Sequence, residues 1–109
     1  MTSDQKIISH RNDRIVEIIA HEAANFIARE AGDESFVTVI RAMLLAHGER
    51  VNVFVSVFPE EKSHAALAFL ERQREAFSNY LKKKTRLSPL PRVDFILDNH
   101  EQFGGPGEN

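Results

Sequence analysis

The 109 residues of this chain include no cysteine and no tryptophan. Without cysteine, a disulfide framework and a thiolate metal site are both excluded. No apolar run approaches the roughly 20 residues that a membrane-spanning helix requires. The N-terminal residues also lack the apolar core of a signal peptide. We therefore expect a cytoplasmic protein that is not attached to a membrane.

The sequence also lacks any arrangement of residues that is typical of catalysis or metal binding. It has five histidines, but no two of them lie four residues apart, where they would share one face of a helix. No glycine-rich loop precedes a Lys-Ser or Lys-Thr pair, as a phosphate-binding loop requires. We therefore expect no enzymatic activity, no cofactor, no metal and no small-molecule substrate.

The length and composition are those of a single globular domain. Hydrophobic residues make up 42% of the chain and charged residues 28%, which is ordinary for a soluble protein. We expect residues 1–10 to form a flexible start, residues 11–99 to form the domain, and the glycine-rich residues 100–109 to form a flexible tail. From about 11 to 31, apolar residues recur at three- and four-residue spacing, which predicts an amphipathic helix that ends at Gly32.

Two strands are predicted next, over 36–45 and 51–58, joined by a turn at 46–49. The first strand is rich in β-branched residues near its start. In the second strand all four valines occupy odd positions and therefore share one face. Its other face carries Phe54 and Phe58 and is only half polar. A strand that is apolar on much of both faces is usually central in its sheet.

A second helical segment is predicted over 60–84, followed by a strand over 92–98. The apolar stripe is interrupted at 72–75, which indicates two helices that meet at a kink. The prolines at 89 and 91 end the helix. A long helical crossover favours parallel pairing of the last strand with the valine strand. The predicted fold is α+β, with element order α-β-β-α-α-β and a three-stranded mixed sheet covered by helices on one face.

Positive charge is concentrated in one segment of this otherwise acidic chain. Seven of the 14 Lys and Arg residues lie between positions 72 and 92, against the single acid Glu75, while the formal net charge is -2. Such a segment is typical of a polyanion site, most often for nucleic acid. The alternative is a solvated helix end, where the lysines at 82–84 stabilise the helix dipole.

The order and spacing of several motifs resemble the ribosome-binding factor A family, which has a type II KH-like domain. The resemblance covers about residues 11–99. It is carried by Arg11-x-x-Arg14, Val37-Thr38-Val39, Val53-Phe54-Val55-Ser56-Val57, Lys83-x-x-Arg86-Leu87 and Pro91-x-Val93-x-Phe95-x-x-Asp98. The chain departs from the family pattern at Gln73-Arg74-Glu75, where the family has Ala-x-Gly at the kink between the paired helices. A single continuous helix over 60–84 is therefore the alternative to the kink. It also has Leu45-Ala46-His47-Gly48 in place of a Ser-x-Asp turn, and Ser78 where an arginine is frequent.

The resemblance implies a non-enzymatic assembly factor that binds the immature small ribosomal subunit at its 16S rRNA and assists late maturation. Nothing in the sequence indicates more than a monomer. The cations that we expect to bind RNA are Arg11, Arg14, Arg72, Arg74, Lys82, Lys83, Lys84, Arg86 and Arg92. One alternative is a KH-like protein-interaction module that has lost RNA binding. A second is a small enzyme that uses His21 and Glu22, which requires a concave pocket holding both side chains.

Two aromatic side chains are expected on the sheet face that is free of helices. Phe54 and Phe58 on such a face are either a stacking platform for bases or a hydrophobic patch that contacts a loop or the tail. We favour the hydrophobic patch. Arg41 is expected to form an ion pair on the sheet rather than to bind RNA.

Overall fold

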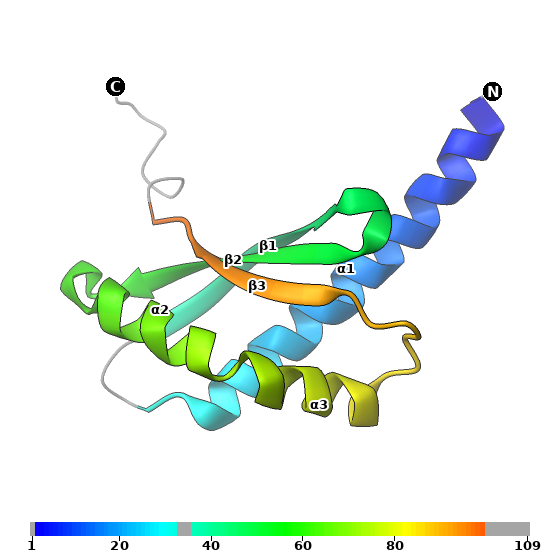
Figure 1. The fold of residues 1–109 in the computed structure, drawn as a ribbon. Coiled ribbons are helices and arrows are strands. Elements are labelled where there is room, and N and C mark those ends of the chain that lie inside the picture. Colours follow the sequence, from blue (N-terminus) through cyan, green and yellow to red (C-terminus); the bar gives the residue numbers. More distant parts are fainter. Residues whose placement is uncertain (1, 33–35, 100–109) are drawn as a thin grey trace, which may run out of the picture.

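The computed structural model describes residues 2–32 and 36–99, with side chains from residue 13 onward. Its elements follow the predicted order (Figure 1). They are α1 (Thr2–Glu30), β1 (Phe36–Leu45), the short 3-10 helix η1 (Ala46–Gly48), β2 (Arg50–Phe58), a second 3-10 helix η2 (Glu60–Lys62), α2 (Ser63–Arg72), α3 (Arg74–Lys84) and β3 (Arg92–Leu97). The α+β prediction is therefore confirmed.

Helix α1 begins at Thr2, well before the predicted start at Arg11. The prediction relied on the apolar stripe, which begins only at Ile15. The preceding residues contain neither glycine nor proline, so nothing in the sequence interrupts the helical backbone there. The predicted flexible tail at 100–109 lies outside the described residues.

The sheet has the order β1-β2-β3, with β2 antiparallel to β1 and parallel to β3. Both pairings were predicted. The four valines of β2 are at most 4% exposed, and Val93 and Phe95 of β3 lie on the same face. Helices α1, α2 and α3 cover this face and contribute Ile19, Ala23, Phe26, Ile27, Leu70, Phe77 and Leu81 to the core (Figure 1).

A bulge in β1 keeps apolar side chains on the core side along the whole strand. Before it, Val37 and Val39 pair with the core-facing valines of β2. The register shifts between Val39 and Arg41, after which Ala42 and Leu44 take those positions. An extra residue in one strand reverses the side-chain alternation at that point, so the even-numbered positions face the core from Ala42 onward.

The predicted kink between the paired helices is present at Gln73. This residue has φ -92° and ψ 4°, which is not helical. Its amide N–H nevertheless donates to the carbonyl oxygens of Phe69 (3.1 Å) and Leu70 (3.0 Å), and its own carbonyl accepts from Phe77 N–H at 2.8 Å. The bend therefore forms without the Ala-x-Gly of the family pattern, because these angles are open to residues other than glycine.

The side chain of Asn99 continues the sheet beyond the end of β3. Its Oδ1 accepts from Val57 N–H at 2.8 Å, and its Nδ2 donates to the Val57 carbonyl at 3.3 Å and to Ser63 Oγ at 3.0 Å. The amide thus takes the place of a peptide group in the parallel ladder and also holds the start of α2. Asn99 is only 6% exposed, so these groups are paired away from water.

Candidate nucleic-acid interface

Three arginines from three different elements surround one carboxylate. Arg50 begins β2, Arg74 begins α3, and Arg92 begins β3, which also carries Asp94. Arg50 Nη2 donates a hydrogen bond to Asp94 Oδ2 at 3.1 Å. Arg74 Nη1 and Arg92 Nε both lie 3.6 Å from Asp94 Oδ1. We call these four residues the arginine cluster.

In the arginine cluster the acid is largely buried and the three cations are more exposed. The Asp94 side chain is 16% exposed, whereas those of Arg50, Arg74 and Arg92 are 53%, 36% and 58% exposed. Burial by itself raises the pKa of the Asp94 carboxyl, but the Arg50 hydrogen bond and the neighbouring guanidinium charges outweigh it and hold that pKa below its usual value. The carboxylate is therefore ionised at neutral pH, and the outer surface is cationic.

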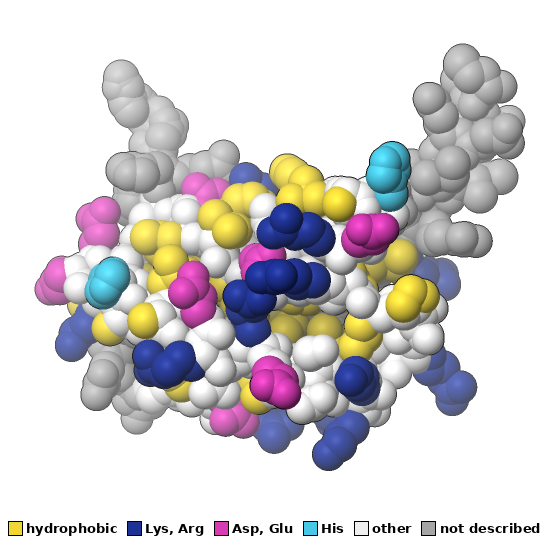
Figure 2. Space-filling model, viewed as in Figure 1, with side chains coloured by type: hydrophobic (Ala, Val, Ile, Leu, Met, Phe, Trp, Pro, Cys, Tyr) yellow, Lys and Arg dark blue, Asp and Glu magenta, His cyan; other side chains and the backbone are white. Residues whose placement is uncertain are grey.

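A hollow of about 560 Å³ adjoins the arginine cluster. It lies between the α2–α3 junction and the segment that enters β3, and its lining includes Arg72, Arg74, Ser78, Pro91 and Arg92. Glu71 and Glu75 line it as well, so its charge is mixed. Figure 2 shows Lys and Arg side chains gathered around an acidic one in the middle of this face, over β3 and the α2–α3 junction.

The three lysines at 82–84 form a second basic group at the C-terminal end of α3. All three are exposed, as is Arg86 in the following loop. Lys84 Nζ also lies 5.8 Å from the centre of the Tyr80 ring. At 1.5 Å per residue, the ten steps from Arg74 to Lys84 span roughly 15 Å along the helix axis. The two basic groups therefore lie at opposite ends of α3.

The predicted site residues are brought together only in part. Arg72, Arg74 and Arg92 line one hollow, and the lysines and Arg86 extend the cationic surface along α3. Arg14 is exposed on α1. The side chain of Arg11 lies outside the described part of the chain.

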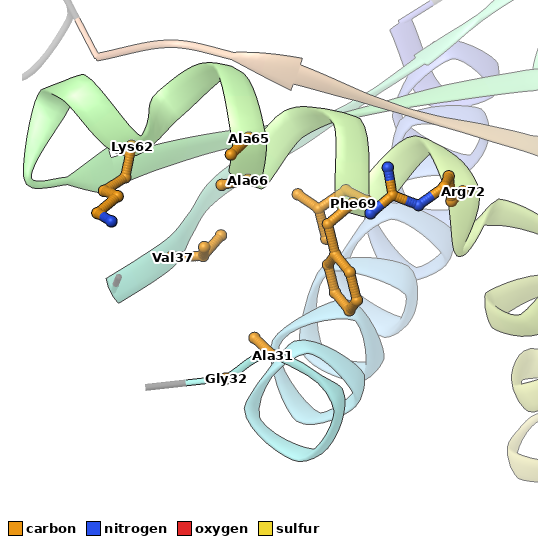
Figure 3. A pocket seen from close by; sticks show the side chains of 9 residues that line it. Ala31, Gly32, Val37, Lys62, Ala65, Ala66, Phe69 and Arg72 are labelled. Atoms are coloured by element: carbon orange, nitrogen blue, oxygen red, sulfur yellow. The ribbon is translucent and has the colours of Figure 1, made fainter. Parts of the chain in front are cut away.

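Arg72 is shared between two hollows. It also borders an apolar pocket of about 250 Å³ between α2, β1 and the end of α1. In Figure 3 its side chain runs back along α2 beside Phe69, with Lys62 at the other end of the pocket. The small residues Ala31, Ala65 and Ala66 leave this space open. Arg72 therefore stands at the edge of the basic surface rather than in the arginine cluster.

Arg50 was missed by the sequence reasoning. It is the first residue of β2, far in sequence from the basic segment at 72–92. The structure pairs Arg50 with Arg92 in the parallel register. Aligning Val51 with Val93 in the predicted β2–β3 pair would have placed the two arginines side by side. The position of Arg50 beside Arg92 was therefore predictable from the strand register and not from the local charge.

The face of the sheet away from the helices carries Phe54 and Phe58. The Arg41 guanidinium lies 4.3 Å from the centre of the Phe54 ring and donates to Asp98 Oδ2 at 3.1 Å. The ion pair expected for Arg41 is therefore confirmed. The guanidinium of the same residue covers the face of the Phe54 ring. Phe58 is 70% exposed and pairs in register with Phe36, which is 73% exposed. A flat platform that includes Phe54 is not available to bases.

The arrangement around His21 and Glu22 does not converge. The hollow beside them is lined by Glu17, Ile18, His21 and Glu22, all from α1. Glu22 accepts a hydrogen bond from the Tyr80 hydroxyl at 2.9 Å, while His21 is exposed. A general acid and base need a substrate position within reach of both side chains. A hollow formed by one helix surface does not offer the concave pocket that the enzyme alternative requires.

Among the side chains described, those of residues 13–32 and 36–99, no three His, Cys, Asp or Glu lie close enough to hold a metal ion. Over the described backbone, residues 2–32 and 36–99, no helix has the length and hydropathy needed to cross a bilayer.

Comparison with known proteins identifies the family. The family model described as ribosome-binding factor A matches residues 11–104. Ribosome-binding factor A of Koribacter versatilis is 30% identical over 108 residues, covering 94% of this chain and 85% of that protein. The Coprothermobacter proteolyticus protein of the same name is 28% identical over 96 residues, covering 86% and 70%.

A solved structure supports the same assignment at the level of the fold. The crystal structure of ribosome-binding factor A from Thermus thermophilus aligns with a TM-score of 0.69 at 24% identity, over 79% of this chain and 94% of that one. The solution structure of a Thermotoga maritima protein aligns with a TM-score of 0.56 at 20% identity, over 92% of each chain. The family match spans most of the described domain, and the chain belongs to the ribosome-binding factor A family.

Proposed function

We propose that this protein binds the immature small ribosomal subunit through its 16S rRNA and assists late maturation, acting as a monomer and without catalysis of its own. The observation that carries the proposal is the arginine cluster at the α2–α3 junction. It places three cations around one carboxylate beside a hollow of about 560 Å³. Family membership supplies the ribosome as the partner.

The separation of the two basic groups fits an RNA backbone better than a small anion. The arginine cluster and the lysines at 82–84 are separated by roughly 15 Å along α3, so one ligand that engages both must be extended. Phosphates along an RNA backbone meet this requirement, and each contact releases counterions. Arginine is suited to the task because its planar guanidinium presents several donors to phosphate oxygens.

The work that such a factor performs is differential binding. A protein that binds one RNA conformation more tightly than another shifts the population toward the preferred one by no more than that difference in free energy. No cofactor is needed for this action.

Co-sedimentation across a salt series tests the proposal. The purified protein is mixed with small subunits, large subunits and whole ribosomes. We expect selective pelleting with free or immature small subunits, weakened by salt and by reversal of the lysines at 82–84 to glutamate. Equal pelleting with every particle would contradict the proposed selectivity.

A matched pair of single variants separates the basic surface from general charge effects. Lys83→Glu and Lys62→Glu reverse the same charge at two exposed positions, one at the end of α3 and the other beside the apolar pocket. We expect only Lys83→Glu to weaken pelleting. If the triple reversal leaves pelleting intact, contacts with ribosomal proteins carry the binding, and the protein-interaction alternative is favoured.

A further inference from the structure

The arginine cluster contains an acid that a simple phosphate site does not need. Three arginines beside a hollow would attract RNA more strongly without Asp94 between them, because a carboxylate repels phosphate. Yet Asp94 is the shared partner of all three, at 3.1, 3.6 and 3.6 Å. Asp94 therefore has a role other than direct contact with phosphate.

We propose that Asp94 is a positioning residue: it holds Arg50, Arg74 and Arg92 as one phosphate-binding set and makes the protein selective for folded RNA over generic polyanions. This inference rests on the proposed function and deepens it. The ligand of the set is the phosphate backbone of RNA, and the selectivity comes from where the three guanidinium groups are held.

The geometry supports a positioning role. Each guanidinium carries five N–H donors, and the recorded contacts with Asp94 involve one nitrogen of each arginine. The remaining donors are left for an outer ligand, since the arginine side chains are 36–58% exposed. Long side chains lose rotamer freedom when they bind, and a shared carboxylate restricts that freedom in advance.

The charge balance supports a selective role. Three cations against one acid leave a net positive charge, but a smaller one than three free arginines would carry. Glu71 and Glu75 in the neighbouring hollow reduce it further. A single strand that adapts to any cationic surface gains little here, whereas an RNA whose phosphates match the fixed donors gains the full set of contacts.

Asp98 provides a matched control within the same chain. Its side chain is 14% exposed, close to the 16% of Asp94, and it accepts a hydrogen bond of the same length, 3.1 Å, from Arg41. It lies just beyond the other end of β3, where the Arg41 guanidinium covers the Phe54 ring. Asp94→Asn and Asp98→Asn therefore remove one comparable charge each, at two different places.

The experiment compares two ligands across a salt series of about 50 to 200 mM. One is a labelled single-stranded oligo-uridine RNA followed by fluorescence anisotropy, and the other is the small ribosomal subunit followed by co-sedimentation. We expect Asp94→Asn to bind the oligo-uridine roughly two- to fivefold more tightly. The salt slope, which is the change in the logarithm of affinity with the logarithm of salt concentration, should be steeper by about 0.7. Its affinity for small subunits should not rise in step, so that selectivity falls.

Two control variants are measured beside Asp94→Asn. Asp98→Asn and the charge-conserving Asp94→Glu should both keep the salt slope of the wild type, and circular dichroism checks that every variant is folded. If Asp94→Asn matches Asp98→Asn on oligo-uridine, or if both ligands gain equally, the proposal is wrong. If the wild type and all variants fail to pellet with subunits, the proposed function is overturned, and the oligo-uridine measurements alone decide whether Asp94 restrains the arginines.

Discussion

The two ends of β3 use polar side chains for opposite purposes. At the entrance, Asp94 is surrounded by three partly exposed arginines, and the cationic excess faces the solvent. Beyond the exit, Asn99 is buried and neutral, and its amide is paired with the Val57 backbone and Ser63. Unbalanced, exposed charge is available to a ligand, whereas a saturated, buried amide serves the fold. Exposed, charged side chains therefore lie at the start of β3, and a buried side chain that stabilises the fold lies beyond its end.

The largest effect on stability is expected at the exit. Asn99→Ala removes three hydrogen bonds and leaves the Val57 N–H and carbonyl unpaired in a buried position. We expect a loss of about 2–4 kcal/mol in the free energy of unfolding, measured by urea denaturation. The folded fraction should still bind RNA with the affinity of the wild type. A matched change at the exposed Asn25 of α1, Asn25→Ala, should not lower stability; an equal loss there would remove the special role of Asn99.

A smaller and pH-dependent effect is expected at the entrance. The folded-state pKa of Asp94 is depressed because its burial is outweighed by the Arg50 hydrogen bond and the neighbouring guanidinium charges. A depressed carboxyl pKa stabilises the fold above the unfolded value near 3.9, and this stabilisation is lost as the pH falls through the lower folded value.

The wild type should therefore be more stable than Asp94→Asn at neutral pH, by about 1 kcal/mol or less because the guanidinium partners are partly exposed. The difference should disappear in strong acid. Thermal unfolding followed at pH 7, 5, 4 and 2, values chosen to bracket the titration, measures it. A difference that stays constant over this range would mean that the charge of Asp94 does not contribute.

The smallest effect on stability, and a clear effect on binding, is expected for Arg92→Ala. Its side chain is 58% exposed, so we expect a change within about 0.5 kcal/mol in the free energy of unfolding. The salt slope of RNA binding should decrease by about 0.7 if one phosphate contact is lost. Anisotropy and urea denaturation on the same sample provide both values. A large loss of stability with unchanged RNA affinity would reverse the comparison between the two ends of β3.

The sequence was informative where a pattern repeats and uninformative where one side chain acts across the fold. The alternating valines predicted a central strand, and the missing apolar residues at 72–75 predicted the kink. The contribution of Arg50 depends on the strand register, and the role of Asn99 depends on a side chain that replaces a peptide group. The bulge at Val39–Arg41 was not anticipated, because a strand sequence that is apolar at nearly every position does not reveal where its alternation reverses.

The predicted basic site stays a prediction, and the structure brings its residues together only in part. Counting charge along the chain located the segment at 72–92, since helix α3 and β3 carry most of those cations. It did not reveal that Asp94 of β3 lies among two of them, Arg74 and Arg92, and the distant Arg50. Local charge is visible in a sequence, but the pairing of charges from separate elements is set by tertiary packing.

The bend at Gln73 has a consequence for the entropy of the chain. A glycine at this point would widen the range of conformations open to the unfolded chain, all of which must be given up on folding. Glutamine restricts that range, and its hydrogen bonds to Phe69 and Leu70 continue the helical backbone through the bend. The corner from which Arg74 projects therefore costs less conformational entropy to form than a glycine bend would.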